Sequence, residues 1–277
     1  MKKEPVPFAK MHGLGNDFVV INCLEKNYVK NPEQFAKDAC RRQFGIGADG
    51  VIMILPSKKA DFKMRIMNAD GSEAEMCGNG IRCFAKYLID RKLTDKSKFT
   101  VETLAGIITP EVHGKLIKAD MGEPVLERSK IPMKGAPGTV IDETLMLKDR
   151  TVNVTAVSMG NPHAVIFVDT FNIPLQELGR EIETHPSFPN KTNVEFATIV
   201  NKKEIAMCVW ERGVGVTMAC GTGACATLVA AVLNGKTNRR ATLHLLGGDL
   251  EIEWAENNHV YLTGPAEEIF TAEYLVK

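Results

Sequence analysis

The sequence predicts an α+β protein of two pseudo-symmetric domains, each a curved sheet or barrel wrapped around a central helix. Three observations lead to this prediction. Segments with strand character outnumber helical ones, the pattern Cys-Gly-x-Gly opens an apolar helix twice, and the chain repeats itself at one spacing. With 277 residues, the chain is long enough for two domains of ordinary size.

The repeat is anchored by Cys77 and Cys220, which lie 143 positions apart. At that offset, MRIMNADG (64–71) aligns with MCVWERGV (207–214). Three more pairs of segments keep the same order at nearly the same offset: GNDFVVI (15–21) with GNPHAVI (160–166), ADGVIMI (48–54) with TNVEFAT (192–198), and TVETLAG (100–106) with TLHLLGG (242–248). Blocks in one order at a near-constant spacing are typical of a duplicated unit. A loop-rich segment, 121–138, marks the boundary between the copies.

Within the first copy, alternating and β-branched residues predict strands in chain order: FVVINCL (18–24), GVIMIL (50–55), FKMRIMN (62–68), KFTVET (98–103) and IITPEV (107–112). A helix is expected at 31–43, because Pro32 suits its first turn and Gly45 follows its end. The pattern GIGADG (45–50) is similar to a dinucleotide-binding fingerprint. Since it would follow a helix and open a strand, we expect a plain turn there.

The helices after the two cysteines differ in character. The helix after Cys77 carries Ile81, Phe84 and Leu88 on one face, as expected for packing against a sheet. The helix after Cys220 is apolar on nearly all sides and stops at Asn234-Gly235, a left-handed cap signal. A helix that is apolar all round has to be enclosed, which predicts that a sheet wraps around it.

Composition excludes several classes of function. Acidic and basic residues balance at 34 each, so the chain offers no electrostatic footprint for nucleic acid or for an anionic membrane surface. No apolar run suits a signal peptide or a membrane span, so we expect a cytoplasmic protein. Seven cysteines, an odd number, argue against a disulfide framework, and their spacing does not fit a structural zinc site. We therefore expect no metal.

The two Cys-Gly turns suggest the chemistry. In CGNG (77–80) and CGTG (220–223), a sulfur stands at the positive end of a helix, which favours its thiolate. The N–H groups of each turn form a small nest that suits a carboxylate. If both turns face one substrate, one sulfur removes a proton from a carbon and the other returns a proton to the opposite side. This arrangement predicts a racemase or epimerase that needs no cofactor.

Two other interpretations of these turns stay open. A single Cys-Gly turn is more often a tight connection with a buried thiol, although its repetition in both copies favours catalysis. A redox dithiol is a third interpretation, but the Cys-x-x-Cys spacing of thiol oxidoreductases is absent.

Over nearly its whole length, the chain resembles the diaminopimelate epimerases. The resemblance rests on these segments in this order: MHGLGNDFVVI, RQFGIGADG, MRIMNADGSEAEMCGNGIRCFAKYL, GNPHAV, TNVEF, WERGVGVTMACGTGACA and LTGPA. It implies epimerisation of LL-2,6-diaminopimelate to the meso form without pyridoxal phosphate, in lysine and peptidoglycan precursor biosynthesis. It also implies a homodimer and a last strand that returns to the first domain. The expected domains are then 1–121 with 267–277, and 122–266.

Residue by residue, the resemblance makes Cys77 and Cys220 the acid–base pair. The residues that it implies for substrate binding are Asn16, Asn68, Gly78, Asn79, Asn161, Asn193, Glu211, Arg212, Gly221 and Thr222. His163 and Glu211 match positions that tune the thiols, and Phe270 matches a position at the dimer interface. The chain departs from the family twice: Gly50 stands where some members have a substrate-binding glutamine, and Phe270 stands where some have tyrosine.

Two rival functions are weighed against this one. Proline and hydroxyproline epimerases share the two cysteines, but that family tends to carry histidine at the position of Asn79 and has no use for Arg212. A non-catalytic amino-acid-binding protein would have no reason to keep both thiols.

Overall fold

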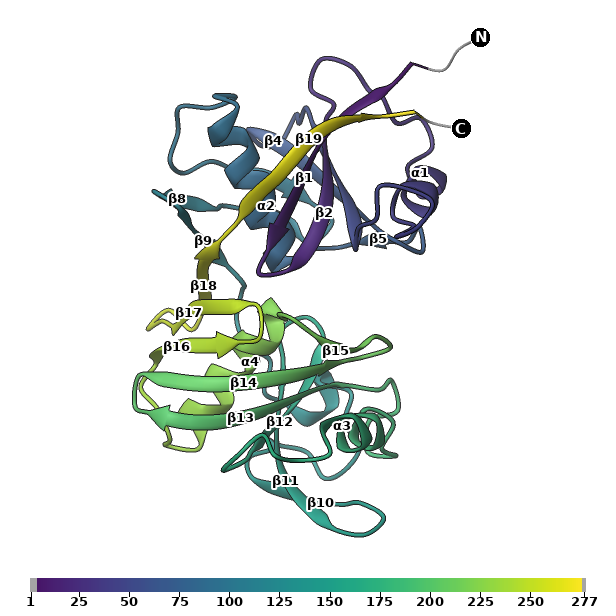
Figure 1. The fold of residues 1–277 in the computed structure, drawn as a ribbon. Coiled ribbons are helices and arrows are strands. Elements are labelled where there is room, and N and C mark those ends of the chain that lie inside the picture. The colour runs from purple at the N-terminus through teal and green to yellow at the C-terminus, as the bar shows by residue number, and fades with distance from the viewer. Residues whose placement is uncertain (1–3, 276–277) are drawn as a thin grey trace. The chain divides into compact units, whose positions relative to one another are not determined.

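The computed structural model describes residues 4–275 and divides into two compact units (Figure 1). One unit comprises Met1–Ala119 and Gly264–Lys277, and the other comprises Asp120–Thr263. The chain passes from one unit to the other within β9 (Leu116–Asp120) and again within β18 (Val260–Pro265). Residues 1–3 and 276–277, which include both ends of the expected first domain and the end of the expected last strand, lie outside the described residues.

The first unit is built on one mixed sheet. Its strands run in the order β19 (Glu267–Tyr274), β1 (Val6–Gly13), β2 (Asn16–Asn22), β3 (Gly50–Leu55), β4 (Phe62–Asn68), β6 (Val101–Thr103) and β7 (Gly106–Ile108), with β5 (Glu73–Ala74) paired to β4. β2 pairs with β3 in parallel, as β4 does with β6, and the other pairs along this path are antiparallel. β8 (Glu111–His113) and β9 form an antiparallel hairpin that belongs to the other sheet, where it follows β18.

The first helix of this unit, α1 (Pro32–Ala39), begins at Asn31, whose side chain accepts an N–H of the first turn at 3.1 Å. It ends four residues earlier than the sequence predicts. The carbonyl of Ala39 accepts hydrogen bonds from the N–H groups of Ile46 and Gly47, at 2.8 and 2.9 Å, which turns the chain back toward β3. The GIGADG segment therefore forms a helix-to-strand turn, as the sequence predicts.

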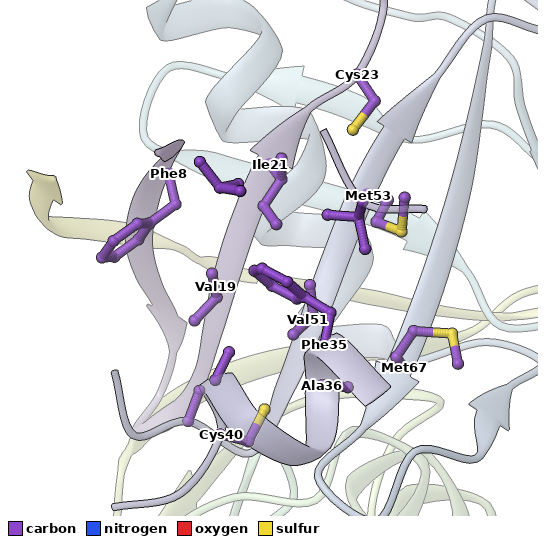
Figure 2. Packing of buried hydrophobic residues seen from close by; sticks show 14 residues of the cluster. Phe8, Val19, Ile21, Cys23, Phe35, Ala36, Cys40, Val51, Met53 and Met67 are labelled. Atoms are coloured by element: carbon purple, nitrogen blue, oxygen red, sulfur yellow. The ribbon is translucent and has the colours of Figure 1, made fainter. Parts of the chain in front are cut away.

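Strand β3 is apolar throughout because helices cover both of its faces. Figure 2 shows Phe35 of α1 pointing at the sheet beside Val51, with which it shares a buried cluster. The neighbouring residue, Ile52, points the other way, since a Cβ added at Gly80 of helix α2 (Gly78–Asp90) would lie 3.5 Å from it. Burial on both faces explains the continuous run GVIMIL.

The second unit repeats the topology of the first. Its strands run β10 (Glu143–Met146), β11 (Thr151–Ser158), β12 (Pro162–Phe167), β13 (Asn193–Asn201), β14 (Glu204–Glu211), β16 (Arg240–Leu245), β17 (Gly248–Trp254) and β18, with β15 (Gly215–Thr217) paired to β14. β12 pairs with β13 in parallel, as β14 does with β16, matching the parallel pairs of the first unit. The short strands β5 and β15 occupy the same place in the two sheets. One pattern of pairing in both units is what a duplicated sequence predicts.

Helix α4 (Gly221–Leu233) is the central element of the second unit. It contacts six strands of one sheet, from β11 to β17, so the sheet curves around it. The strand order is an open path, however, so the predicted alternative of a closed barrel is wrong. The helix is followed by Gly235 at φ +66°, the left-handed cap that the sequence predicts. Helix α3 (Leu175–Glu183) packs on the other face of the sheet, and a 3-10 turn spans Arg128–Lys130.

Gly179 of α3 is expected to tolerate no side chain. A Cβ added there would lie 2.6 Å from Cγ of Trp210 on β14, and Trp210 is held by a 2.7 Å hydrogen bond from its Nε1 to Glu183. Gly179→Ala is therefore expected to lower the free energy of unfolding by about 1–3 kcal/mol, despite the better helix propensity of alanine. Urea denaturation measures this change, and an unchanged or higher midpoint would contradict it.

Candidate active site

Cys77 and Cys220 occupy equivalent positions in the two units, each as the N-cap of a buried helix. Cys77 precedes α2 with φ −144° and ψ 120°, and Cys220 precedes α4 with φ −120° and ψ 111°. In each case the sulfur accepts the N–H three residues further on: Gly80 donates at 3.4 Å and Gly223 at 3.3 Å. Ser, Thr, Asp and Asn are the usual residues at this position. Here the positive end of each helix acts on a sulfur instead, which stabilises its thiolate.

The residues predicted to form the nests are the first residues of the two helices. They are Gly78 and Asn79 on α2, and Gly221 and Thr222 on α4. Their N–H groups lie in the first turn, where a helix supplies no backbone acceptor. An anion such as a carboxylate can therefore bind at each turn, directly beside the sulfur.

In the first unit, a chain of amide hydrogen bonds leads from Cys77 to Asp49. Sγ of Cys77 lies 3.8 Å from Oδ1 of Asn16, which also accepts a hydrogen bond from Nδ2 of Asn79 at 3.1 Å. Nδ2 of Asn16 donates to Oδ2 of Asp49 at 2.8 Å. At the other end, Oδ1 of Asn79 accepts a hydrogen bond from the guanidinium of Arg82 at 2.9 Å. The structure thus brings Asn16 and Asn79 together at Cys77, as expected for one site.

Asp49 belongs to a cluster of charged side chains. Arg42 donates to Asp49 at 2.7 Å and forms two hydrogen bonds of 2.9 Å with Asp17, and the buried Lys10 lies 2.6 Å from Asp17. Burial raises the pKa of Asp17, but the hydrogen bonds from Arg42 and Lys10 outweigh it and keep that pKa below its usual range. Asp17 is therefore an anion at neutral pH, held by two cations.

Asn68 lies at the end of β4, at the edge where Asp49 also lies. Its backbone pairs in register with Gly50, and the N–H of Ala69 donates to the carbonyl of Asp49 at 3.2 Å. The side chain of Asn68 is exposed and donates to Ser72 at 2.9 Å. Asn68 therefore shares the strand edge with the amide chain, with its side chain turned to a local turn.

In the second unit, Cys220 lies in acidic surroundings. The residue is buried, and burial raises the pKa of its thiol well above the ordinary value. The charges of Glu211 and Glu195 raise this pKa further, while hydrogen bonds to Thr222, at 3.5 Å, and from Gly223 lower it. The net effect keeps this thiol protonated in the free protein.

His163 on β12 is fully buried between the side chains of Glu195 and Asn161. Its Nδ1 lies 2.7 Å from Oε1 of Glu195, and its Nε2 lies 2.9 Å from Oδ1 of Asn161. Glu195 is also fully buried, and its Oε2 has no hydrogen-bond partner among the described residues. A Cβ added at Gly223 would lie 2.6 Å from Oε1 of Glu195 and 3.2 Å from Sγ of Cys220. The His163–Glu195 pair therefore reaches the turn that carries the thiol.

The remaining predicted residues of this unit lie at neighbouring strand ends. Oδ1 of Asn193 accepts the N–H of Arg212 at 2.9 Å, and Asn193 pairs in register with His163. Glu211 precedes Arg212 at the end of β14 and accepts a hydrogen bond from Thr217 at 2.5 Å. The structure thus gathers Asn161, His163, Asn193, Glu211, Arg212, Cys220 and Thr222 at one edge of the second unit.

Three residues in the hydrogen-bond networks near the two cysteines were not identified as site residues from the sequence. They are Asp49 and Arg82 near Cys77, and Glu195 near Cys220. Arg82 and Glu195 have 0% relative exposure, and both stand inside apolar segments, GIRCFAKYL and NVEFATIV. A buried charge is unfavourable unless it is paired, so a charged residue in such a segment predicts a specific partner. The sequence carries that signal for Arg82 and Glu195. It carries none for Asp49, which stands in the GIGADG segment that was interpreted as a plain turn.

Other kinds of site receive no support. Among residues 4–275, no three His, Cys, Asp or Glu side chains are grouped so that they could hold a metal ion. None of the seven cysteines, all of which lie within the described residues, forms a disulfide. In the same range, no helix has both the length and the apolar character needed to cross a membrane.

The fold and the capped helices define a class of protein: two similar sheet-dominated domains, each presenting one thiol at the N-terminus of a buried helix. Comparison with known families identifies the member of this class. The model of the family described as diaminopimelate epimerase matches residues 8–127 and 155–269. The chain belongs to the diaminopimelate epimerase family, which confirms the resemblance seen in the sequence, and it is an enzyme of the isomerase class.

Relatives with this name are similar over almost the whole chain. The diaminopimelate epimerase of Pelotomaculum thermopropionicum is 56% identical over 276 residues, which cover 96% of this chain and 98% of the relative. That of Heliobacterium modesticaldum is 53% identical with the same coverage, and that of Acetivibrio thermocellus is 53% identical over 96% of this chain and 97% of its own.

Solved structures confirm the fold at much lower identity. A PhzF-family phenazine biosynthesis protein of Bacillus anthracis has a TM-score of 0.72 and 15% identity, covering 99% of this chain and 100% of its own. A hydroxyproline epimerase of Agrobacterium vitis, with bound trans-4-hydroxy-L-proline, has a TM-score of 0.70 and 14% identity, covering 100% and 94%. At such identities the likeness extends to the fold alone, and it does not favour the hydroxyproline epimerase alternative.

Proposed function

We propose that this enzyme converts LL-2,6-diaminopimelate to meso-diaminopimelate by a two-cysteine acid–base reaction without a cofactor. One sulfur, as a thiolate, removes the proton from an α-carbon, and the other, as a thiol, returns a proton to the opposite face. The carrying observation is the equivalent capping of a buried helix by Cys77 and by Cys220. Identity above 50% to enzymes of that name supports the choice of substrate. The reaction would serve lysine and peptidoglycan precursor biosynthesis in the cytoplasm.

The helix N-termini supply the electrostatic part of the reaction. Removing the α-proton places negative charge on the substrate carboxylate next to that carbon. The N–H groups of Gly78, Asn79, Gly221 and Thr222 would bind this carboxylate, and their hydrogen bonds strengthen as its charge grows. The proposal requires both turns to reach one substrate carbon.

Glu211 and Glu195 suggest how substrate binding activates Cys220. Burial and these two charges raise the pKa of the Cys220 thiol in the free protein. A substrate ammonium group bound at Glu211 would offset one negative charge and so favour the thiolate. His163, bonded to Glu195, would tune the same thiol. The base would then form where a substrate is present.

The distal end of the substrate accounts for the neutral amides and the arginine. Asn16, Asn68, Asn161 and Asn193 would contact the substrate, several of them at its second amino-acid group. The planar guanidinium of Arg212 would pair with the carboxylate of that group through two hydrogen bonds. Proline has no second amino-acid group, so a proline-type racemase would leave these side chains without a role.

We also propose that the enzyme is a homodimer that associates through β19. This strand ends the sheet of the first unit, and seven of its eight residues are exposed. Among them are Ile269 and Phe270, at 53% and 46% relative exposure, and the ring of Phe270 packs edge-on against Phe8 at 6.0 Å. A long edge strand with exposed apolar residues is a surface that proteins usually cover.

An assay of substrate range tests the proposed function. The purified enzyme is incubated with LL-diaminopimelate, L-proline or trans-4-hydroxy-L-proline, in EDTA and without pyridoxal phosphate, and the stereoisomers are separated by chiral chromatography. We expect meso-diaminopimelate from the first and no change in the others. Turnover of either proline substrate with none of diaminopimelate would replace the proposal with its rival.

A further inference from the structure

The amide chain of the first unit has a direction that is fixed at both ends. Arg82 can only donate hydrogen bonds, so the group of Asn79 that faces it must be the acceptor Oδ1. A carboxylate such as Asp49 can only accept, so the group of Asn16 that faces it must be the donor Nδ2. The bond between the two asparagines then follows without choice, from Nδ2 of Asn79 to Oδ1 of Asn16.

This direction decides which atom faces the sulfur. With Nδ2 of Asn16 held by Asp49, the carbonyl oxygen Oδ1 lies 3.8 Å from Sγ of Cys77. A carbonyl oxygen can accept the S–H of a thiol, whereas it repels a thiolate. The amide of Asn16 thus opposes the effect of the α2 N-terminus, which favours the thiolate.

We propose that Asp49 is a positioning residue: by fixing the amide of Asn16, it holds Cys77 as a thiol in the free protein. The inference deepens the proposed function, because it makes Cys77 a proton donor before substrate arrives. The oriented amide acts on the thiol in the free protein, so its effect does not depend on which substrate the enzyme converts.

The other charged groups around the amide chain hold Asp49 in place. Arg42, from the segment after α1, bonds both Asp49 and Asp17, and Lys10 of β1 lies against Asp17. The N–H of Asp17 also donates to Oδ2 of Asp49 at 3.1 Å. On the far side, Arg82 of α2 bonds the carbonyl of Gly78 at 2.9 Å as well as Asn79. The two acceptor oxygens of Asp49 are therefore occupied by donors from three different residues.

Asp49→Asn is the variant that breaks the direction of the chain. The new amide has one oxygen where the carboxylate had two, and with that oxygen toward Arg42 its NH2 group faces the NH2 group of Asn16. Asn16 then turns its own oxygen toward that NH2 group and away from Cys77. This turn removes the carbonyl that opposes the thiolate.

The readout is the rate at which iodoacetamide alkylates Cys77 in the free protein. Trypsin isolates this cysteine in the peptide 66–82, because Arg65 and Arg82 bound it and Cys83 falls in the next peptide. We expect Asp49→Asn to raise the rate at pH 7 by about three- to tenfold, with the pH–rate profile moved to lower pH. Arg42→Gln is the matched control, since it loosens the same cluster but leaves the carboxylate that orients Asn16, and its rate should stay at the wild-type value.

A double-mutant cycle separates orientation from charge. Asn16→Ala removes the carbonyl itself and should raise the rate as Asp49→Asn does. In the Asn16→Ala background, Asp49→Asn should then add nothing. A wild-type rate in Asp49→Asn, or a rise that persists in the Asn16→Ala background, would overturn the proposal. None of these measurements uses epimerase activity, so they can fail while the proposed function holds, and the reverse.

Discussion

Replacing either Cys77 or Cys220 with serine is expected to lower kcat by at least about 100-fold while the protein stays folded. General acid–base catalysis by a placed side chain contributes roughly 10²–10⁴ to a rate, and a serine hydroxyl ionises too weakly to replace a thiolate at neutral pH. The fold should survive because serine is a strong N-cap whose Oγ can accept the N–H that the sulfur now accepts. Steady-state kinetics and thermal unfolding measure the two effects separately.

Cys208→Ser is the matched control for these variants. Cys208 lies on β14 and is only partly buried, and it takes no part in the proposed chemistry. Its replacement should leave kcat within about twofold of the wild type. If Cys77→Ser or Cys220→Ser kept a comparable rate, that sulfur would not be an acid or base in the reaction.

Adding one methyl group to the turn at Cys220 should lower the free energy of unfolding more than adding one to the turn at Cys77. A Cβ at Gly223 would lie 2.6 Å from a carboxylate oxygen of Glu195, which is fully buried and bonded to His163. Gly223→Ala is therefore expected to lower the free energy of unfolding by about 1–3 kcal/mol, because the buried His163–Glu195 hydrogen bond has to be displaced. Activity should fall with it, since the same displacement moves two groups that act on Cys220.

Gly80→Ala is the matched variant in the first unit. Its Cβ would lie 3.2 Å from the side-chain tip of Ile66, 3.3 Å from Cβ of Cys77 and 3.5 Å from the tip of Ile52, and a small shift of the Ile66 tip relieves the shortest of these contacts. The better helix propensity of alanine offsets that strain, so stability should change by less than about 1 kcal/mol. Urea denaturation of both variants makes the comparison. Equal losses would show that the buried carboxylate behind Cys220 does not constrain the turn.

The parts of the fold that could be predicted from the sequence are those where local pattern and burial agree. The run GVIMIL predicts β3 because both faces of that strand are covered, and the apolar helix after Cys220 predicts an enclosing sheet. β1 and α3 were not predicted. β1 carries Lys10 and His12 among its apolar residues, which hides its strand pattern. For β1, pairing with neighbouring strands rather than local pattern decides the structure. In α3, by contrast, Leu175, Leu178 and Ile182 stand at helical spacing, so the sequence did carry a signal for this helix.

The site divides in the same way. Cys77 and Cys220 could be predicted from the sequence because one short motif contains the sulfur, the glycines and the start of the helix. The partners of those turns are not local: Asp49 meets Asn16 across 33 positions, and Glu195 meets His163 across 32. Such contacts follow from the register of β2 with β3 and of β12 with β13. That register is set by the packing of whole sheets, which no short segment of sequence specifies.

The central claim, that two different sulfurs act on opposite faces of one carbon, is tested most directly by isotope transfer from solvent. LL-diaminopimelate is converted in D₂O, and both isomers are recovered at low conversion for mass spectrometry. The account predicts one deuterium in the meso product and almost none in the remaining LL substrate, because the returning proton comes from a thiol that has exchanged with solvent. A product that keeps the original α-hydrogen would show that a single group moves the proton, and it would contradict the account.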